Sequence, residues 1–464
     1  MSWQRLSPRM LLVHPVHELL RQLPLLIGAI VLGSTTGNPW WTVAALAVTA
    51  LLGAARWFTT SYRIEPDEVQ LRAGVLHRKV LSVPRNRIRS VQTDARLLHR
   101  LLGLAVLRVS TGREAAGDNV FELDAVEVAQ VPRLRAILLA ESEPPADQAT
   151  GVMLARWQPS WLRYAPLSLS GLVTIAAAVG VVYQSGFAAP LRQFGMDTAQ
   201  RYGVAATVAV VLLASVLLAV MRSLLTYGNL VLLRREGFLE LRHGLLRVRE
   251  HTYDTSRLRG GTLRQPLLVR ALRGARLDAV MTGVHGAGES SMLLPPCPAA
   301  AAEGVLTGLV GSSDVVTGPL RGHGPRAAAR RWTRALGLPA LAGVVLAALG
   351  GPAWVWLVWA GVMVCCALMA ADRVQALGHR VDADWLVARA GCLERRRDCL
   401  ATAGIIGWTV RQTPMQRRAG VVTLVAATAA GVKRYPLIDV PEQQAWSVAA
   451  TASPWVAGSV WATR

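Results

Sequence analysis

Lysine is almost absent from this chain, and four long stretches of the sequence contain no charged residue of either sign. Only Lys79 and Lys433 are lysine among the 50 basic residues, and the 29 acidic residues leave a formal net charge of +21. The stretches without Asp, Glu, Lys, Arg or His are Leu23–Ala55, Tyr164–Leu191, Gly203–Met221 and Ala335–Ala371. Proton relays and intramembrane hydrolases need ionisable groups at depth, so this absence argues against both classes.

Cysteine is also scarce, with five residues in 464. Cys365 and Cys366 are adjacent within an uncharged stretch, and Cys297, Cys392 and Cys399 have neither CxxC spacing nor the pattern of a disulfide framework. No sequence pattern places a base beside a thiol, so we interpret the cysteines as structural. We therefore expect no enzymatic activity, no cofactor and no metal.

Long apolar stretches are abundant in the sequence. Hydrophobic residues make up 52% of the chain, and the mean hydropathy is +0.34. One transmembrane helix needs about 20 apolar residues, so the longest stretches are long enough for two. Turn residues divide them at Ser34–Pro39, at Gln184–Arg201 and at Gly350–Pro352. The sequence predicts six transmembrane helices in three hairpins.

Basic residues precede each predicted hairpin, whereas the turns within the hairpins carry little charge. The flanking arginines are Arg5, Arg9 and Arg21, then Arg156 and Arg163, then Arg326, Arg330, Arg331 and Arg334. Cytoplasmic flanks of membrane helices are enriched in basic residues. We therefore expect a multi-pass protein of the cell membrane, with both termini and all soluble segments in the cytoplasm.

The segments that follow the hairpins share an Arg-x-Gly-x-Leu motif, at Arg72–Leu76, Arg242–Leu246 and Arg389–Leu393. Each motif is followed by a glutamine, a short turn rich in leucine or methionine, a glycine and a run of β-branched or apolar residues. Such runs, broken by glycine and polar turns, are typical of antiparallel strands. Each series closes with a proline and a helical pattern, at Pro132, Pro298 and Pro441.

We refer to Thr59–Ala140, Asn229–Val310 and Leu377–Ala450 as the first, second and third segments. Each is predicted to form a small β-sandwich closed by one C-terminal helix, which makes the fold class an α+β membrane protein. The predicted domains are hairpins at 1–58, 151–226 and 316–373, which alternate with soluble domains at 59–150, 227–315 and 374–464.

Paired apolar helices, the Arg-x-Gly-x-Leu turn, the glutamine-containing loop, the leucine-rich turn before a glycine and the final helix together resemble the bacterial membrane-flanked domain proteins. The resemblance covers nearly the whole chain and implies pleckstrin-homology-like (PH-like) soluble modules. One large membrane-bound branch of that family has three such units in a row, and this chain resembles it. The resemblance implies no chemistry. The third segment departs from the pattern, because Gly404 stands where the other segments have Arg87 and Arg257.

Clusters of arginine in the soluble segments predict contact with acidic surfaces. We expect Arg87, Arg89, Arg257 and Arg259 to bind anionic lipid headgroups, since each such charge near an anionic leaflet contributes about 1 kcal/mol. Positive-inside bias and solubility explain the same charges without any binding role. Nucleic acid is a poorer partner, because the clusters lack aromatic stacking positions and a reading motif.

Two classes of function follow. The first is a non-enzymatic membrane scaffold or adaptor, in which three cytoplasmic PH-like modules bind membrane lipids or a partner membrane protein. The alternative is a lipid-handling transporter or carrier subunit, in which the hairpins enclose an apolar path. The uncharged spans and the basic segments are compatible with both classes, and we favour the scaffold.

Overall fold

The computed structural model describes residues 3–5, 7–9, 40, 58–65, 67–73, 79–85, 88, 90–95, 97–110, 121–139, 151–167, 204–283, 291–350 and 352–458. The chain divides into two compact units. Unit 1 comprises Met1–Trp157 and Leu224–Ser256, and unit 2 comprises Gln158–Ser223 and Arg257–Arg464. The boundary falls within the second segment, so its strands are divided between the units.

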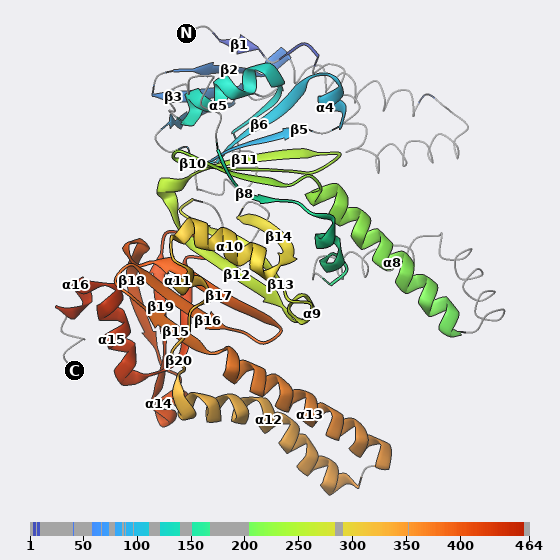
Figure 1. Cartoon of the computed structure of the whole chain (residues 1–464), viewed down its shortest axis with the longest axis vertical. Helices are drawn as coiled ribbons and strands as arrows, with labels where there is room; N and C mark the ends of the chain where they lie inside the picture. Colours follow the sequence, from blue (N-terminus) through green and yellow to red (C-terminus); the bar gives the residue numbers. More distant parts are fainter. Residues whose placement is uncertain are drawn as a thin grey trace. The chain divides into compact units, whose positions relative to one another are not determined.

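Unit 1 contains two antiparallel sheets (Figure 1). The four-stranded sheet has the order β1 (Gln4–Arg5), β2 (Ser61–Ile64), β3 (Glu68–Ala73) and β4 (Lys79–Pro84). The seven-stranded sheet has the order β7 (Phe121–Glu127), β6 (Leu104–Ser110), β5 (Ser90–Ala95), β11 (Val248–Asp254), β10 (Phe238–His243), β9 (Val231–Arg235) and β8 (Val152–Arg156). The short helix α4 (Leu97–Leu101) and the closing helix α5 (Val131–Leu139) complete this part of the fold.

The core of unit 1 lies between these sheets and α5. Val69 of β3, Leu107 of β6 and Leu138 of α5 belong to one buried cluster. Alternation along the strands places such side chains on one face. The first segment therefore forms the β-sandwich with a closing helix that the sequence predicts.

Unit 2 also contains two antiparallel sheets. The six-stranded sheet has the order β14 (Met292–Pro298), β13 (Gly274–Met281), β12 (Leu258–Pro266), β17 (Glu394–Ala401), β16 (Trp385–Ala390) and β15 (Gly378–Val381). The three-stranded sheet consists of β18 (Ile405–Arg411), β19 (Val421–Thr428) and β20 (Arg434–Pro441). The short helices within or directly after the second and third segments are α9 (Leu267–Ala271), α10 (Ala299–Val310), α11 (Ser313–Thr317), α14 (Pro414–Ala419), α15 (Glu442–Ala452) and α16 (Pro454–Ala457).

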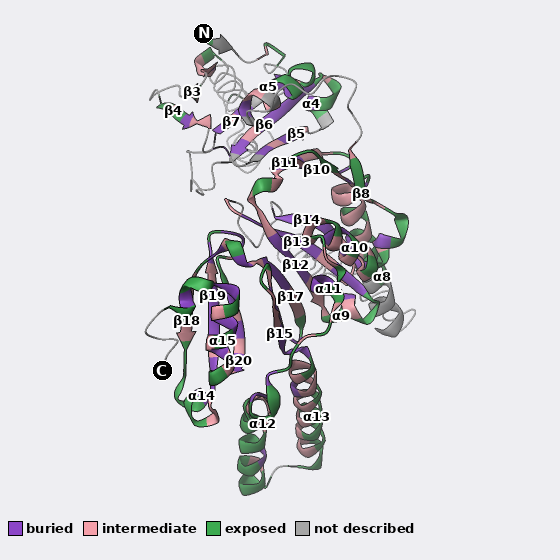
Figure 2. Cartoon of the chain, turned by 60° about the vertical axis from the view of Figure 1, so that its left-hand side comes forward, coloured by how far each residue is buried: buried purple, intermediate pink, exposed green. Residues whose placement is uncertain are grey.

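The closing helices begin where the sequence predicts. Pro298 is the N-cap of α10 and Pro441 is the N-cap of α15, each with an extended backbone that leads into the helix. Val448 and Ala449 of α15 are buried in the same cluster as Leu424 of β19. The third segment is thus also a β-sandwich closed by a helix, as Figure 2 shows by the buried strands beside α15.

Each large sheet joins strands from two successive segments. In unit 1, β5 of the first segment pairs with β11 of the second, from Ala95 opposite Val248 to Ser90 opposite Tyr253. In unit 2, β12 of the second segment pairs with β17 of the third, from Gly260 opposite Leu400 to Pro266 opposite Glu394. Hydrogen bonding therefore continues from one segment into the next within each unit.

Two helices of the described chain are long and apolar enough to cross a membrane, α12 (Gly324–Leu349) and α13 (Ala353–Ala376). They lie side by side as a hairpin, with exposed residues along both (Figure 2). Gly350 ends α12 in the left-handed conformation and Pro352 caps α13, so the turn predicted at Gly350–Pro352 is confirmed. Gly343 lets the Trp359 ring approach α12, where the indole donates to the Pro339 carbonyl at 2.8 Å.

The other predicted spans are only partly described. The apolar stretch of the first hairpin, Leu23–Ala55, lies outside the described residues apart from Trp40. In the second hairpin, α8 (Val204–Tyr227) confirms one predicted helix, which has an apolar stretch at Leu213–Tyr227. The other predicted helix of this hairpin falls largely on residues 168–203, which are not described. Six spans stay a prediction.

Candidate functional site

The four arginines expected to bind headgroups are only partly described. Arg87 and Arg89 lie outside the described residues. Arg257 ends the short 3-10 helix η4 (Thr255–Arg257) and Arg259 lies in β12, and both are half-buried. A Cβ added at Gly404 would lie 2.8 Å from the Arg259 Cδ, so glycine there makes room for that side chain. Headgroup binding by these arginines stays a prediction.

The Arg-x-Gly-x-Leu motif of the third segment binds the C-terminal end of α13. Arg389 Nε donates to the Ala376 carbonyl at 3.0 Å, and its Nη2 donates to the Gln375 carbonyl at 3.0 Å. The last carbonyls of a helix lack intrahelical donors, and a cation there also complements the helix dipole. The motif therefore caps the apolar helix that precedes it.

The motif of the second segment closes α8 in a related way. His243 Nδ1 donates to the Thr226 carbonyl at 2.8 Å, and the Leu245 amide donates to the Leu225 carbonyl at 3.1 Å. The donors differ from those in the third segment, but the acceptors are again in the last helical turn. In the first segment, residues 74–78 of the corresponding turn lie outside the described residues.

Both described motifs require their glycine. Gly244 and Gly391 have φ angles of +103° and +109°, which side chains rarely adopt. A Cβ at Gly244 would lie 2.0 Å from the Arg247 carbonyl oxygen, and one at Gly391 would lie 2.0 Å from that of Glu394. The glycine of Arg-x-Gly-x-Leu thus permits the tight turn that brings the motif to the helix end.

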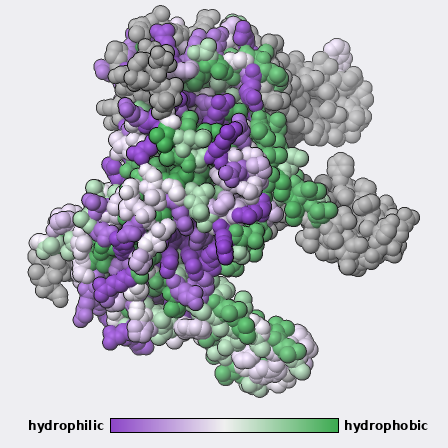
Figure 3. Space-filling model, in the orientation of Figure 1, coloured by the Kyte–Doolittle hydropathy of each residue, from purple (hydrophilic) through white to green (hydrophobic). Residues whose placement is uncertain are grey.

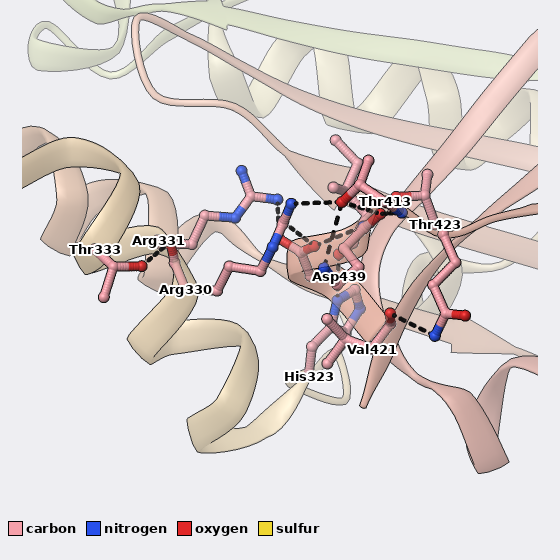
Figure 4. A network of polar contacts seen from close by, with 11 residues as sticks. His323, Arg330, Arg331, Thr333, Thr413, Val421, Thr423 and Asp439 are labelled. Atoms are coloured by element: carbon pink, nitrogen blue, oxygen red, sulfur yellow. Dashed lines mark hydrogen bonds and ion pairs between the residues drawn. The ribbon is translucent and has the colours of Figure 1, made fainter. Parts of the chain in front are cut away.

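A buried carboxylate fixes α12 to the third segment (Figure 4). Asp439 of β20 has no exposed surface. Its Oδ2 lies 2.8 Å from Arg331 Nη2, its Oδ1 pairs with Arg330, and Gln416 Nε2 donates to Oδ1 at 2.9 Å. Burial of a charge is costly unless partners of opposite charge and hydrogen bonds surround it. Two guanidinium groups and one amide meet that requirement here.

A second carboxylate fixes α13. Asp372 lies in the last turns of α13, and its Oδ2 lies 3.0 Å from Arg270 Nη2 of α9. Its Oδ1 lies 2.6 Å from Arg395 Nη2 of β17. The two arginines come from the second and third segments. The apolar hairpin is therefore joined by ion pairs to the second and third segments, near the start of α12 and near the end of α13.

Two buried histidines lie beside the start of α12. His379 Nδ1 of β15 lies 2.9 Å from His323 Nε2, and His323 Nδ1 donates to the Ile438 carbonyl at 2.8 Å. Burial lowers the pKa of His379 to about 4, with further lowering by His323 and Arg321. Burial also lowers the pKa of His323. The lowered pKa values favour the neutral form of both rings, and the pair forms a hydrogen-bonded chain that ends at the Ile438 carbonyl.

The cysteines outside the hairpin are buried thiols. Burial raises the pKa of Cys297 and of Cys399 to about 12, and it also raises the pKa of Cys392. A thiol with a raised pKa is a poor nucleophile at neutral pH. Among the residues that the structure describes, no group of His, Cys, Asp and Glu side chains is arranged to hold a metal ion.

Sequence reasoning missed the two carboxylates that fix the hairpin. Asp372 offered a signal, because it is the first charge after the uncharged stretch that ends at Ala371. Asp439 offered none, since a single acid in an apolar strand does not reveal its partners. The sequence indicates Arg330 and Arg331 only as basic flanks of a predicted hairpin.

Small β-sheets with closing helices, fixed by helix caps and buried ion pairs to an apolar helical hairpin, define a class of β-module proteins that carry a hairpin long and apolar enough to cross a membrane. The Bacterial PH domain family matches residues 19–142 and 333–451, which together make up more than half of the chain. The chain belongs to that family. The second segment lies outside both matched regions. No curated protein and no solved structure matches the chain.

Proposed function

We propose that this protein is a non-enzymatic, multi-pass protein of the cell membrane that presents PH-like modules to lipids or to a partner membrane protein. The observation that carries the proposal is the fixation of α13, with Arg389 at its last carbonyls and Arg270 and Arg395 at Asp372. A module held this closely to an apolar helix stays at the membrane surface. It acts as a scaffold or adaptor at the cell envelope.

The proposal includes three units of hairpin and module, with all modules in the cytoplasm. The shared glycine geometry of the second and third motifs supports the repeat, and arginines before each hairpin support the orientation. Cysteines introduced at Gly37 and Gly195 should react with an impermeant reagent from outside intact cells. Reaction of a cysteine at Gly286 from outside would contradict this topology.

Anionic headgroups are the ligand class that the basic surface favours. In the full-length chain purified in detergent, water-soluble short-chain phosphatidylglycerol should bind more tightly than phosphatidylcholine of the same length. The difference should shrink as salt increases, because about 0.15 M salt screens exposed charges beyond roughly 8 Å. Isothermal titration calorimetry measures both affinities.

The residue assignment has its own test. Arg257→Ala with Arg259→Ala should weaken phosphatidylglycerol binding, whereas Arg411→Ala with Arg434→Ala removes the same charge from exposed sites in the third segment. Equal loss in both pairs would mean that net charge alone governs binding. No loss in either pair would leave positive-inside bias as the explanation of these arginines. Transfer of labelled lipid between vesicles by the purified chain would favour the carrier alternative.

A further inference from the structure

Exposed leucines gather in unit 2 where the second and third segments meet. The set, which we call the leucine rim of unit 2, consists of Leu267, Leu268, Leu272 and Leu393. These side chains are between 43% and 60% exposed. The first three lie in or next to α9, and Leu393 lies in the turn between β16 and β17. The two elements touch, because the Leu267 amide donates to the Leu393 carbonyl at 2.7 Å.

This rim lies beside the soluble end of α13. Arg270, which shares α9 with two of the leucines, pairs with Asp372, and Arg395, two residues after Leu393, pairs with the same carboxylate. Asp372 directly follows the uncharged stretch of the hairpin. It therefore marks the level at which α13 passes from apolar to polar surroundings. Figure 3 shows the apolar surface of the hairpin below the more hydrophilic sheets of unit 2.

Unit 1 repeats the arrangement independently. Its leucine rim consists of Leu98, Leu101, Leu245 and Leu246, which are all exposed. The first two lie in α4 of the first segment, and the others lie in the motif turn of the second. Arg100 Nη1 donates to the Leu245 carbonyl at 2.8 Å, and the Leu245 amide donates to the Leu225 carbonyl of α8. A short leucine-rich helix thus again meets an Arg-x-Gly-x-Leu turn at the end of an apolar helix.

The strand pairing explains why the two motifs meet. β5 leads into α4 and β12 leads into α9, while the turns before β11 and β17 carry the Arg-x-Gly-x-Leu leucines. Pairing of β5 with β11 and of β12 with β17 brings the leucine-rich turn of one segment to the motif of the next. The leucine-rich turn and the Arg-x-Gly-x-Leu motif, two degenerate sequence patterns, therefore lie next to each other in the fold.

The chemistry of both rims fits a phospholipid leaflet. Clusters of exposed large apolar side chains are uncommon on surfaces that face water. Here each cluster adjoins the end of an apolar helix, and arginines lie on or directly after the same short helices, at Arg100, Arg270 and Arg273. Leucine enters the apolar side of a membrane interface, and arginine meets phosphate on its polar side. Under the proposed function, a bilayer crossed by α13 occupies the space beside the rim of unit 2.

We propose that both leucine rims insert into the cytoplasmic leaflet, at the boundary between headgroups and acyl chains and to a depth of about 5–10 Å. The inference rests on the proposed membrane placement and adds a second, non-spanning contact with glycerophospholipid. It assigns the rims a ligand that differs from the headgroup contacts of the four predicted arginines. Insertion of a rim holds its sheet at a fixed tilt to the bilayer.

Depth-dependent quenching tests the proposal on the full-length chain in nanodiscs of phosphatidylcholine and phosphatidylglycerol. Cys365→Ala and Cys366→Ala remove the cysteines of the hairpin, and the other three are buried. A fluorophore is then attached to a cysteine introduced at Leu268 or Leu101. The lipids carry bromine either near the glycerol end or near the methyl end of the acyl chain. Leu272→Cys serves as a second site in the rim of unit 2 should Leu268→Cys fail to fold.

Two label sites provide the controls. Val364 is exposed in the middle part of α13 and reports the span itself. Ile406 is exposed on β18, at the far end of that strand from α14. The strand runs for seven residues, which is about 20 Å. α14 contacts α12, so Ile406 reports a surface away from the hairpin base.

The outcomes separate the inference from the proposed function. Insertion predicts fluorescence loss at Leu268 and Leu101, and this loss is stronger with bromine near the glycerol end. Val364 should lose fluorescence with bromine near the methyl end, and Ile406 should lose none. Loss at Val364 alone, with Leu268 and Leu101 behaving like Ile406, would overturn rim insertion and leave the membrane placement intact. No loss at Val364 would overturn the membrane placement, and the inference with it.

Discussion

Arg389 and Ala376 are joined across thirteen residues of chain by a hydrogen bond of 3.0 Å from the guanidinium Nε to the last carbonyl of α13. Between them, the chain leaves the helix, forms β15 and returns along β16. The first residue of the Arg-x-Gly-x-Leu motif therefore acts on the helix that precedes its own segment. This relationship accounts for the position of the motif shortly after an apolar stretch.

The first prediction concerns this cap. Arg389→Ala leaves the carbonyls of Gln375 and Ala376 without these donors, and loss of hydrogen bonds to a charged group costs about 1.5–3 kcal/mol. We expect a lower free energy of unfolding, measured in detergent by tryptophan fluorescence. Arg389→Lys should fall between wild type and Arg389→Ala, because one ammonium does not reproduce the planar pair of donors. An effect no larger than that of Arg434→Ala, at an exposed site, would contradict the cap.

The second prediction concerns the motif glycines. Gly244→Ala and Gly391→Ala each force a side chain into a left-handed backbone and against a carbonyl oxygen, so each should cost at least about 1–3 kcal/mol. Gly304→Ala is the matched control. It lies in α10 with nothing within 4 Å of an added Cβ, so alanine should be neutral or should stabilise by up to about 1 kcal/mol. Thermal unfolding of the three variants compares them directly, and similar effects at all three positions would refute the turn geometry.

Local patterns predicted much of the fold. The glycines and proline at Gly350–Pro352 predicted the turn of the third hairpin, and Pro298 and Pro441 predicted the starts of closing helices. These features depend on the backbone preferences of single residues, which a sequence displays directly. The alternation of apolar and polar residues predicts the strands of the first and third segments for the same reason.

The pairing between segments was not predictable. Alternation shows that Val248–Asp254 and Ser90–Ala95 form strands, but it does not show that they pair with each other. The site was less predictable still. Asp439 and Arg331 are far apart in sequence, and only the folded chain shows that β20 and the start of α12 meet. The leucine-rich turn and the Arg-x-Gly-x-Leu motif were both visible, yet their proximity depends on the same unpredicted strand pairs.

The third prediction concerns the carboxylate that fixes α12. Asp439→Asn removes the negative charge between Arg330 and Arg331 and leaves two guanidinium groups without it. Removing one partner of a buried ion pair costs about 3–5 kcal/mol. We expect a large fall in stability and faster proteolysis of the third segment. Asp384→Asn, at an exposed position in the same segment, should change neither measurement. Near-equal stability of the two variants would show that Asp439 is not required.

The last prediction concerns acid. Folding lowers the pKa of His379 from about 6.5 to about 4, so the unfolded chain takes up a proton before the folded chain does. The contribution of His379 to stability is complete above pH 6.5 and is lost as the pH falls towards 4. The whole change amounts to about 3 kcal/mol, since each pKa unit corresponds to about 1.4 kcal/mol. The charged groups that face the pair are Asp439 and Arg331 beside His323 and Arg321 beside His379.

His379→Asn tests this assignment, because an amide can still donate to His323 but does not titrate. Its free energy of unfolding should vary less with pH than that of the wild type between pH 6.5 and 4, and the two slopes should agree above pH 6.5. Denaturant titrations at several pH values provide the slopes. Asp384→Asn should follow the wild type throughout. An unchanged slope in His379→Asn would assign the acid sensitivity to other groups and show that the buried histidine pair does not control it.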